Sequence, residues 1–283
     1  MCEFCVEHGE GKKWYLQAKN YSQELWNEER KRMTTEFFEK WEENAVNNYK
    51  GLDQLRATDP AALEAMLPTI VEEQKKEHWG QVVPMEEIEQ ILDMMVNIIR
   101  LPCGCRSATR GLYDARYCFG VTGPGRVETP SEGMDNVVLE YPDFSDGLEV
   151  LTKEEAKKAI DRHDRNGLIH TVWTFITPYI SGICNCTTTD CLAMRGRLRS
   201  GVTVAFPFFK AEHVASIDWE NCNGCRDCKK LCQFGAIVYS PTIAKCYVNQ
   251  FECYGCGVCR ATCPKDAITL RDRNAIPALA EEW

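Results

Sequence analysis

The chain has 283 residues, 44% of them hydrophobic and 27% charged, and this composition excludes a disordered, fibrous or coiled-coil protein. The net charge of −9 argues against nucleic acid as a partner. The 17 cysteines are odd in number and follow no apolar export signal, which favours reduced, metal-binding thiols in a cytoplasmic protein. The longest stretch without acidic or basic side chains, residues 166–189, is too polar for a membrane span.

Residues 1–100 are predicted to form a helical region. Apolar side chains recur at three- and four-residue steps in the stretches 14–25, 33–41 and 85–99, and a further helix is predicted to begin near Pro60. Because the aromatic residues follow the same steps, they indicate core packing. A homo-oligomer interface is the alternative interpretation of these aromatic side chains.

Residues 101–210 are predicted to form a mixed α/β domain that carries cysteines. An irregular, proline- and glycine-rich stretch is expected at 119–150. A helix then begins at the capping box formed by Thr152 and Glu155 and ends at Gly167. Strands rich in β-branched and aromatic residues are expected at 168–176 and 202–209.

Residues 211–273 contain the spacing C-x2-C-x2-C-x3-C twice, from Cys222 and again from Cys253. In this iron–sulfur spacing the first three thiolates wrap one cluster, and the fourth points away to the other. Gly224 and Gly255 supply the backbone freedom for the wrap. The spacing predicts one [4Fe-4S] cluster on Cys222, Cys225, Cys228 and Cys263, and a second on Cys253, Cys256, Cys259 and Cys232.

This segment resembles the bacterial ferredoxin domain with two [4Fe-4S] clusters, and the resemblance implies one-electron transfer. Pro264 follows the second motif as in that family, whereas Gln233 stands after the first. The departure predicts an altered turn and a changed cluster potential, with ligation unchanged. Cys246 lies outside both motifs and is interpreted as a core thiol.

Six further cysteines lie in the middle region. Two C-x-C pairs, Cys103/Cys105 and Cys184/Cys186, are each followed by another cysteine, Cys118 and Cys191 respectively. If folding brings the pairs together, their four thiolates are enough for a third [4Fe-4S] cluster or a tetrahedral zinc ion, with the two following cysteines less favoured as ligands. Six buried, metal-free thiols are the alternative.

Five arginines flank these cysteines: Arg106, Arg110, Arg195, Arg197 and Arg199. They either offset the charge of thiolates or form a solvated basic face. His170 lies on a predicted apolar strand and is interpreted as a core histidine rather than a ligand. Cys2, Cys5 and His8 have a metal-like spacing, but their place at a terminus argues against a site. No motif indicates flavin, nicotinamide or nucleotide.

From Leu101 to Leu270 the chain also resembles a group of 4Fe-4S ferredoxin-domain proteins of anaerobic bacteria and archaea. The shared elements are Pro-Cys-x-Cys-Arg at 102–106, Leu-Thr-x-Glu-Glu-Ala at 151–156, Gly-Leu-x-His at 167–170 and Ile-Cys-Asn-Cys at 183–186. The group is denser in cysteine after the last element, where this chain has three threonines, an aspartate and only Cys191. The resemblance implies redox work in anaerobic metabolism and supplies no substrate.

Together these features predict an α+β protein: a helical region 1–100, a mixed C-x-C domain 101–210, a ferredoxin domain 211–273 and a tail 274–283. The predicted function is iron–sulfur electron transfer for a redox partner or oxidoreductase complex, as a carrier or as a subunit. The alternative is a redox enzyme with a third metal site at the C-x-C cysteines, fed by the ferredoxin clusters. No catalytic residue is predicted.

Overall fold

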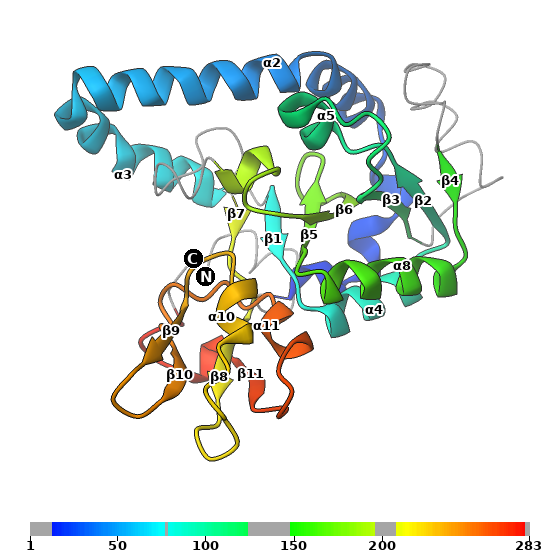
Figure 1. Cartoon of the computed structure of the whole chain (residues 1–283). Coiled ribbons are helices and arrows are strands. Elements are labelled where there is room, and N and C mark those ends of the chain that lie inside the picture. Colours follow the sequence, from blue (N-terminus) through cyan, green and yellow to red (C-terminus); the bar gives the residue numbers. More distant parts are fainter. Residues whose placement is uncertain (1–12, 77–78, 124–147, 196–207, 281–283) are drawn as a thin grey trace.

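The computed structural model describes residues 13–76, 79–123, 148–195 and 208–280. Its centre is a seven-stranded sheet with the order β4-β2-β3-β6-β5-β1-β7, and two two-stranded sheets, β10-β9 and β11-β8, belong to the C-terminal domain (Figure 1). Neighbouring strands of the large sheet run antiparallel, except that β1 and β7 run parallel. The protein therefore mixes helices and sheet and ends in a small domain of its own, as predicted.

The large sheet is made of β1 (Gly80–Val82), β2 (Asn97–Leu101), β3 (Cys118–Thr122), β4 (Glu149–Val150), β5 (Ile169–Thr174), β6 (Ile180–Cys186) and β7 (Phe208–Phe209). The C-terminal strands are β8 (His213–Ile217), β9 (Ile237–Ser240), β10 (Lys245–Val248) and β11 (Ile268–Asp272). The helices are α2 (Glu28–Thr58), α3 (Pro60–Lys76), α4 (Met85–Met94), α5 (Gly104–Arg110), α8 (Lys153–Arg165), α10 (Asp227–Leu231) and α11 (Val258–Ala261). Short 3-10 turns are η1 (Trp14–Leu16), η2 (Ala18–Tyr21), η3 (Gln23–Leu25) and η4 (Arg273–Ala275).

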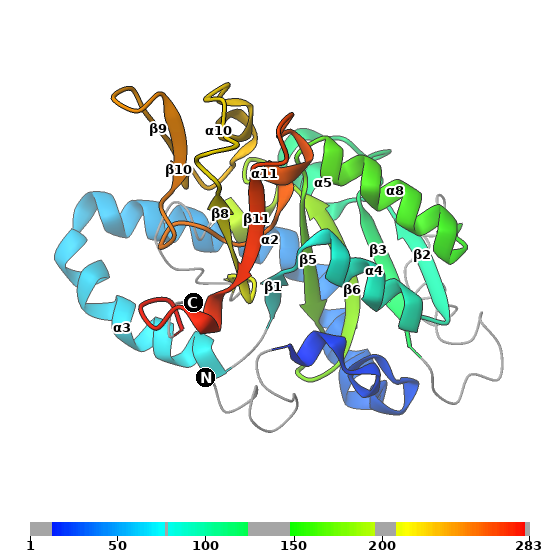
Figure 2. The ribbon, with the colours of Figure 1, turned by 90° about the horizontal axis from the view of Figure 1, so that it is seen from below.

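Helices α4 and α8 cover one face of the large sheet, whereas α5 and the start of α2 lie on the other side (Figures 1 and 2). Ile88 of α4 and Ile160 of α8 are fully buried against Phe119 of β3 and Ile183 of β6. These apolar faces form the main core because burying them removes a large hydrophobic area from water. Successive residues of a strand point to opposite faces, so the neighbours of Phe119 and Ile183 face away from this core.

The prediction of a wholly helical region 1–100 is wrong in three places. The stripe 14–25 forms three 3-10 turns, because the adjacent side chains Trp14 and Tyr15 are both buried and neighbouring residues cannot share one face of an α-helix. Helix α4 ends at Met94, and the expected continuation through Ile99 is instead strand β2, paired with β3. Strand β1 also lies before residue 100, whereas the helix at Pro60 is confirmed.

In the middle region the expected helix and one expected strand are confirmed, whereas the irregular stretch expected at 119–150 is wrong at both ends, because β3 reaches Thr122 and β4 begins at Glu149, each paired with β2. The side chain of Thr152 accepts a hydrogen bond from the Glu155 amide, and the Glu155 carboxylate bonds back to Thr152, which is the predicted capping box. Gly167 follows the end of α8 with φ +78°. Strand β5 falls within the expected 168–176. Strand β7 covers only the end of the expected 202–209, because residues 196–207 lie outside the described ranges, as do 124–147 and Cys2, Cys5 and His8.

A buried carboxylate joins the C-terminal domain to the core. Glu87 of α4 is 2% exposed, and its oxygens lie 2.8 Å from His213 Nε2, 2.6 Å from Lys13 Nζ and 2.6 Å from the Tyr15 hydroxyl. Burial opposes ionisation, but these three partners outweigh it and lower the pKa of Glu87 to about 2. The ion pair therefore holds β8 and the N-terminal segment against the same helix.

Next to it, Glu86 receives both terminal nitrogens of Arg260 from α11, at 3.0 and 2.6 Å. A bidentate contact of this kind fixes orientation as well as distance.

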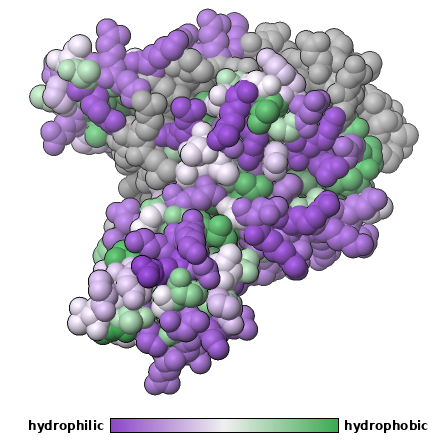
Figure 3. Space-filling view, in the orientation of Figure 1, coloured by the Kyte–Doolittle hydropathy of each residue, from purple (hydrophilic) through white to green (hydrophobic). Residues whose placement is uncertain are grey.

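Within the described ranges, none of the helices combines the length and the apolarity needed to cross a bilayer. On the face drawn in Figure 3, hydrophilic side chains predominate and apolar side chains form small patches among them.

Candidate iron–sulfur sites

Two tight loops carry the repeated cysteine motifs. Gly224 and Gly255 occupy equivalent places with φ +72° and +70°. A β-carbon at Gly224 would lie 2.1 Å from the Ala244 carbonyl oxygen, and one at Gly255 would lie 2.1 Å from the His213 oxygen. Both positions therefore require glycine for backbone conformation and for space, in agreement with the role predicted for them.

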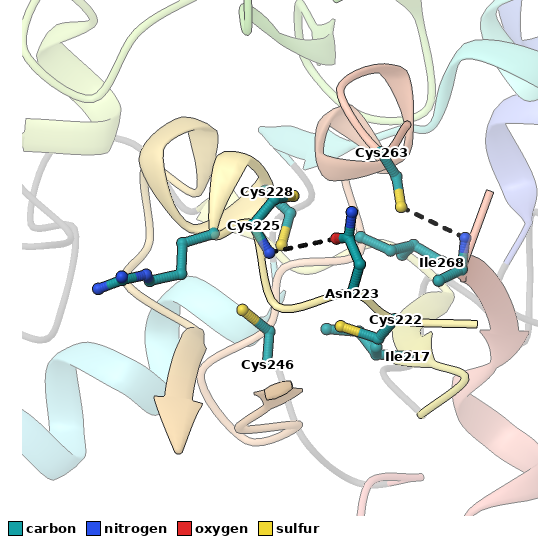
Figure 4. A pocket seen from close by; sticks show the side chains of 10 residues that line it. Ile217, Cys222, Asn223, Cys225, Cys228, Cys246, Cys263 and Ile268 are labelled. Atoms are coloured by element: carbon teal, nitrogen blue, oxygen red, sulfur yellow. Dashed lines mark hydrogen bonds between the residues drawn. The ribbon is translucent and has the colours of Figure 1, made fainter. Parts of the chain in front are cut away.

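The first site is a pocket that both motifs line (Figure 4). Its thiols are those of Cys222, Cys225, Cys228, Cys246 and Cys263. Cys263 belongs to the second motif, yet it lies with the first three cysteines of the first motif, as the crossed pattern requires. Cys225 is exposed and Cys228 is buried, so one side of this site reaches the surface.

The second site lies deeper. Cys253 and Cys259 are each 7% exposed, and they interact electrostatically with Cys232 of the first motif. Cys256 interacts electrostatically with the same three cysteines, Cys253, Cys259 and Cys232. Of the eight predicted ligands, this set combines three cysteines of the second motif with the last of the first; Cys253 and Cys259 are buried, and Cys232 and Cys256 are partly buried.

Backbone amides point at the sulfur atoms of both sites. The amides of Ala215 and Gly255 each lie 3.4 Å from Cys253 Sγ, and the Ala267 amide lies 3.3 Å from Cys263 Sγ. Burial raises the pKa of Cys228 to about 12 and also raises the pKa of Cys259, so bare thiolates are costly there. Thiolates bound to a positive metal core and receiving amide hydrogen bonds avoid that cost, so the donor set fits an iron–sulfur cluster.

A buried arginine supports the second site, and sequence reasoning did not single it out. Arg273 of η4 is 1% exposed and donates to the carbonyl oxygens of Ala211 at 2.9 Å, His213 at 2.9 Å and Cys253 at 2.6 Å. Its charge is one of the factors that oppose the burial-driven rise in the pKa of Cys253. A lone arginine ten residues beyond the last motif cysteine carries no spacing that would identify it.

Cys246 was interpreted as a core thiol, and it is 1% exposed. Its thiol is hydrogen-bonded with that of Cys228 and lines the first pocket (Figure 4). The structure therefore adds a fifth sulfur at the first site. Its position on β10, between the two motifs and part of neither, explains why spacing alone did not place it there.

The six cysteines of the middle region also come together. Cys118 of β3 and Cys184 of β6 are partners in register, and their sulfur atoms lie 3.6 Å apart. They flank Phe119 and Ile183, so they face away from the main core. Cys103, at the start of α5, is hydrogen-bonded with Cys118. These three thiols form the first group.

The second group is Cys105, Cys186 and Cys191. Cys191 is hydrogen-bonded with both Cys105 and Cys186; Cys186 and Cys191 are buried and Cys105 is partly buried. Each C-x-C pair is thus divided between the two groups, whereas the sequence placed the two pairs in one four-thiol set. Cys118 and Cys191, predicted as less favoured, touch the other four because strand register and a tight loop bring them there.

Arg106 lies among these thiols and is 4% exposed. Its Nη1 is 3.6 Å from Cys103 Sγ, its Nε is 3.2 Å from Asp190 Oδ2, and its guanidinium stacks 3.8 Å from the Tyr117 ring centre. Arg110 Nε lies 2.5 Å from Asp190 Oδ1. A hydrogen bond from Cys118, helped by Arg106 and opposed by burial, lowers the pKa of Cys103 to about 6.

His170 is a core residue, as interpreted from the sequence. It is fully buried, its Nδ1 lies 2.6 Å from Asn185 Oδ1, and its Nε2 lies 3.4 Å from Asp164 Oδ1. It precedes Thr171, whose partner in register is Cys184, so it faces the opposite side of the sheet from the thiols. Across the described ranges, no three histidine, cysteine or acidic side chains converge on a point suited to one metal ion.

Comparison with known proteins locates the likeness in the C-terminal domain. The model of the 4Fe-4S dicluster domain family matches residues 210–267. Archaeal-type glutamate synthase [NADPH] of Thermotoga maritima is 37% identical over 63 residues, which are 22% of this chain and 12% of that protein. A subunit of the ion-translocating oxidoreductase complex of Methanosarcina acetivorans is 39% identical over 62 residues, 22% of this chain and 23% of that protein.

Ferredoxin-type protein NapF of Escherichia coli K12 is 44% identical over 54 residues, which are 18% of this chain and 33% of that protein. The chain therefore covers no more than a third of these relatives. What they share with it is the segment that holds both cysteine motifs. Residues 210–267 are therefore a 4Fe-4S dicluster domain of the ferredoxin type.

Proposed function

We propose that this protein passes electrons to or from a partner oxidoreductase through two [4Fe-4S] clusters with crossed ligation. Cys222, Cys225, Cys228 and Cys263 hold one cluster, and Cys253, Cys256, Cys259 and Cys232 hold the other. The observation that carries the proposal is the single pocket that Cys263 shares with the first motif. When bound, such clusters supply one-electron redox chemistry.

The protein's own residues make the two sites unequal. Cys225 is exposed, so the first site is the one open to a redox partner. Cys253 and Cys259 are buried, and Arg273 fixes the backbone around Cys253. Burial and amide hydrogen bonds to sulfur are among the features that set cluster potentials. Electrons therefore enter or leave at the first site and are held away from water at the second.

The relatives support a partner that is itself a redox enzyme, because two of them are named as a glutamate synthase and as a subunit of an ion-translocating oxidoreductase complex. We assign the protein to the cytoplasm and to anaerobic metabolism on its reduced cysteines and on the resemblance of residues 101–270. The same proposal includes the domain layout, which divides the chain into regions 1–100, 101–210, 211–273 and 274–283. It also includes a homo-oligomer that forms through the N-terminal aromatic residues.

Paired substitutions test the ligand assignment on protein purified without oxygen. Cys225→Ser and Cys263→Ser should remove the same electron paramagnetic resonance signal, and Cys232→Ser should remove the other. Each of these variants should lose about four iron atoms, those of the affected cluster. The assignment fails if Cys263→Ser and Cys256→Ser remove the same signal, and the electron-transfer role fails if the purified protein binds no iron.

A second candidate is a redox enzyme with its own site at the C-x-C cysteines. The observation that favours it is the pair of three-thiol groups in the middle region, with Arg106 Nη1 3.6 Å from Cys103 Sγ. Steady conversion of a small molecule by the isolated chain would separate it from the carrier, which passes electrons to an acceptor protein and converts nothing else.

A further inference from the structure

We propose that the cysteines of the middle domain hold a third iron–sulfur centre, a [4Fe-4S] cluster with four of the six thiols as ligands, which lies beside Arg106 and the second ferredoxin site. The inference rests on the proposed function only for its supply of electrons. The six-thiol site is defined as Cys103, Cys105, Cys118, Cys184, Cys186 and Cys191.

The six-thiol site is built by the fold. Cys118, Cys184 and Cys186 lie on one face of adjacent strands, since Cys118 pairs with Cys184 and residues two apart on a strand share a face. Cys103 and Cys105 come from the start of α5, which follows the end of β2, the strand paired with β3. All six are free thiols, and even Cys118 and Cys184, at 3.6 Å, are far beyond a disulfide bond of about 2.05 Å.

Positive charge lies beside the thiols of the site and favours a negatively charged group there. Arg106 is buried, and its carboxylate partner Asp190 is shared with Arg110. Arg106 Nη1 donates to the Asn185 carbonyl oxygen at 3.5 Å and also lies 3.6 Å from Cys103 Sγ, and Arg110 is half-exposed. A buried charge is stabilised by opposite charge nearby. Asp190 supplies that charge to Arg106 but also pairs with Arg110, and thiolates bound to an iron–sulfur core add negative charge on the side of Cys103.

The arrangement favours a centre with several irons over a single zinc ion. Zinc needs four donors around one point, about 2.3 Å from each sulfur. Among the described residues no such convergence occurs, at the six-thiol site or at the ferredoxin cysteines. A cubane instead places each thiolate on a different iron and accepts a wider donor set. A [4Fe-4S] cubane takes four thiolates, so two of the six thiols lie beside it without binding iron.

The six-thiol site adjoins the second ferredoxin site. Cys186 and Cys191 belong to the same apolar cluster as Tyr254 and Val258, and Cys105 and Cys256 pack against that cluster. Cys256 is a proposed ligand of the second ferredoxin cluster.

Phe234 and Tyr254, both of the C-terminal domain, stack with ring centres 3.9 Å apart and pack in that same apolar cluster. Gln233, the residue after Cys232, accepts a hydrogen bond from the Thr188 amide at 2.7 Å, in the loop that joins Cys186 to Cys191. The loop of the six-thiol site and the chain at a ferredoxin ligand are therefore fixed to each other, which places the new centre at the inner end of an electron path.

The test is iron and acid-labile sulfide per chain, on protein purified without oxygen, with electron paramagnetic resonance of the reduced protein. We expect about twelve of each in the natural protein and about eight in the double variant Cys184→Ser/Cys186→Ser. The ferredoxin signals of that variant should stay, which also shows that it is folded. Thr189→Ala, in the exposed loop between Cys186 and Cys191, is the control and should keep about twelve.

A second, milder variant keeps every thiol. Arg106→Gln removes the buried positive charge, so it should shift the potential of the third centre to a more negative value and leave the ferredoxin potentials unchanged. Arg110→Gln, whose side chain is half-exposed and pairs with Asp190, should shift it much less. Equal shifts in the two variants would remove Arg106 from the proposal.

The outcomes also separate this inference from the proposed function. About eight irons in the natural protein, unchanged in the double variant, would overturn the third centre and leave the two ferredoxin clusters intact. Zinc at the six-thiol site, measured as about one per chain and lost in the double variant, would overturn it as well. A protein without iron would overturn the proposed function itself.

Discussion

Gln233 accepts a hydrogen bond from the Thr188 amide at 2.7 Å, and its side-chain nitrogen donates to the carbonyl oxygen of Gly167. One amide side chain thus joins the first cysteine motif to the loop after β6 and to the end of α8. The sequence marked Gln233 as a departure from the ferredoxin pattern. The structure shows that the departure makes a contact between domains, which a proline cannot make.

Replacing Gln233 by alanine should loosen this contact without affecting ligation. Two partly buried hydrogen bonds are lost, so we expect the unfolding free energy to fall by about 1–3 kcal/mol. Hydrogen exchange at the Thr188 amide should become faster, while amides of β9 and β10 stay protected. Gln90→Ala, which removes an exposed contact within α4, is the control and should change neither. Unchanged exchange at Thr188 would contradict the contact.

Replacing Cys246 by alanine should alter the first cluster and keep it bound. When Cys228 is a metal-bound thiolate it can only accept a hydrogen bond, so the Cys246 thiol is the donor. Loss of that donor should shift the potential of the first cluster to a more negative value, measured by redox titration, and leave the second unchanged. Loss of about four irons would instead make Cys246 a ligand.

Glu87 should make stability depend on pH in the acid range. Its folded pKa of about 2 lies below the ordinary value of 4.5, so its contribution is complete above pH 4.5 and is lost as pH falls toward 2. The shift corresponds to about 3 kcal/mol. Glu87→Gln should lower the urea midpoint at pH 7, and its difference from the natural protein should shrink below pH 4.5. A constant difference between pH 7 and pH 3 would contradict this.

Two glycine substitutions should separate the cost of a left-handed backbone from the cost of a steric clash in the cluster loops. Gly235 and Gly255 have the same φ of +70°, but a β-carbon at Gly235 meets nothing within 4 Å, whereas one at Gly255 meets the His213 oxygen at 2.1 Å. Gly235→Ala should cost about 1–2 kcal/mol for the left-handed conformation. Gly255→Ala should cost more and reduce the iron content, and equal losses in denaturant unfolding would refute the close approach.

The sequence was informative where function depends on local spacing. The two motifs predict two sets of four cysteines from spacing alone, because a short loop defines its own geometry and Gly224 and Gly255 mark its tight turn. The capping box at Thr152 and the end at Gly167 were predictable for the same reason: both depend on residues within one turn of the helix.

Where function depends on strand register, the sequence did not predict which residues meet. Nothing in the spacing of Cys118 and Cys184 shows that β3 and β6 are neighbours, 66 residues apart. The apolar pattern through Ile99 was consistent with a helix, but residues 97–101 form a strand because they pair with β3. Arg273 and Glu87 likewise act through contacts made across the whole chain, so single-sequence patterns could not identify them.

The carboxylate of Glu87 also joins parts of the chain that are synthesised at different times. Lys13 and His213, 200 residues apart, meet there at 3.4 Å, and Trp14 and Tyr15 beside Lys13 are part of the main core. A ribosome makes the N-terminal side of a chain first. The contact between Lys13 and His213 therefore forms only after the C-terminal domain has been made, whereas Trp14 and Tyr15 are buried among residues no later than Ile183.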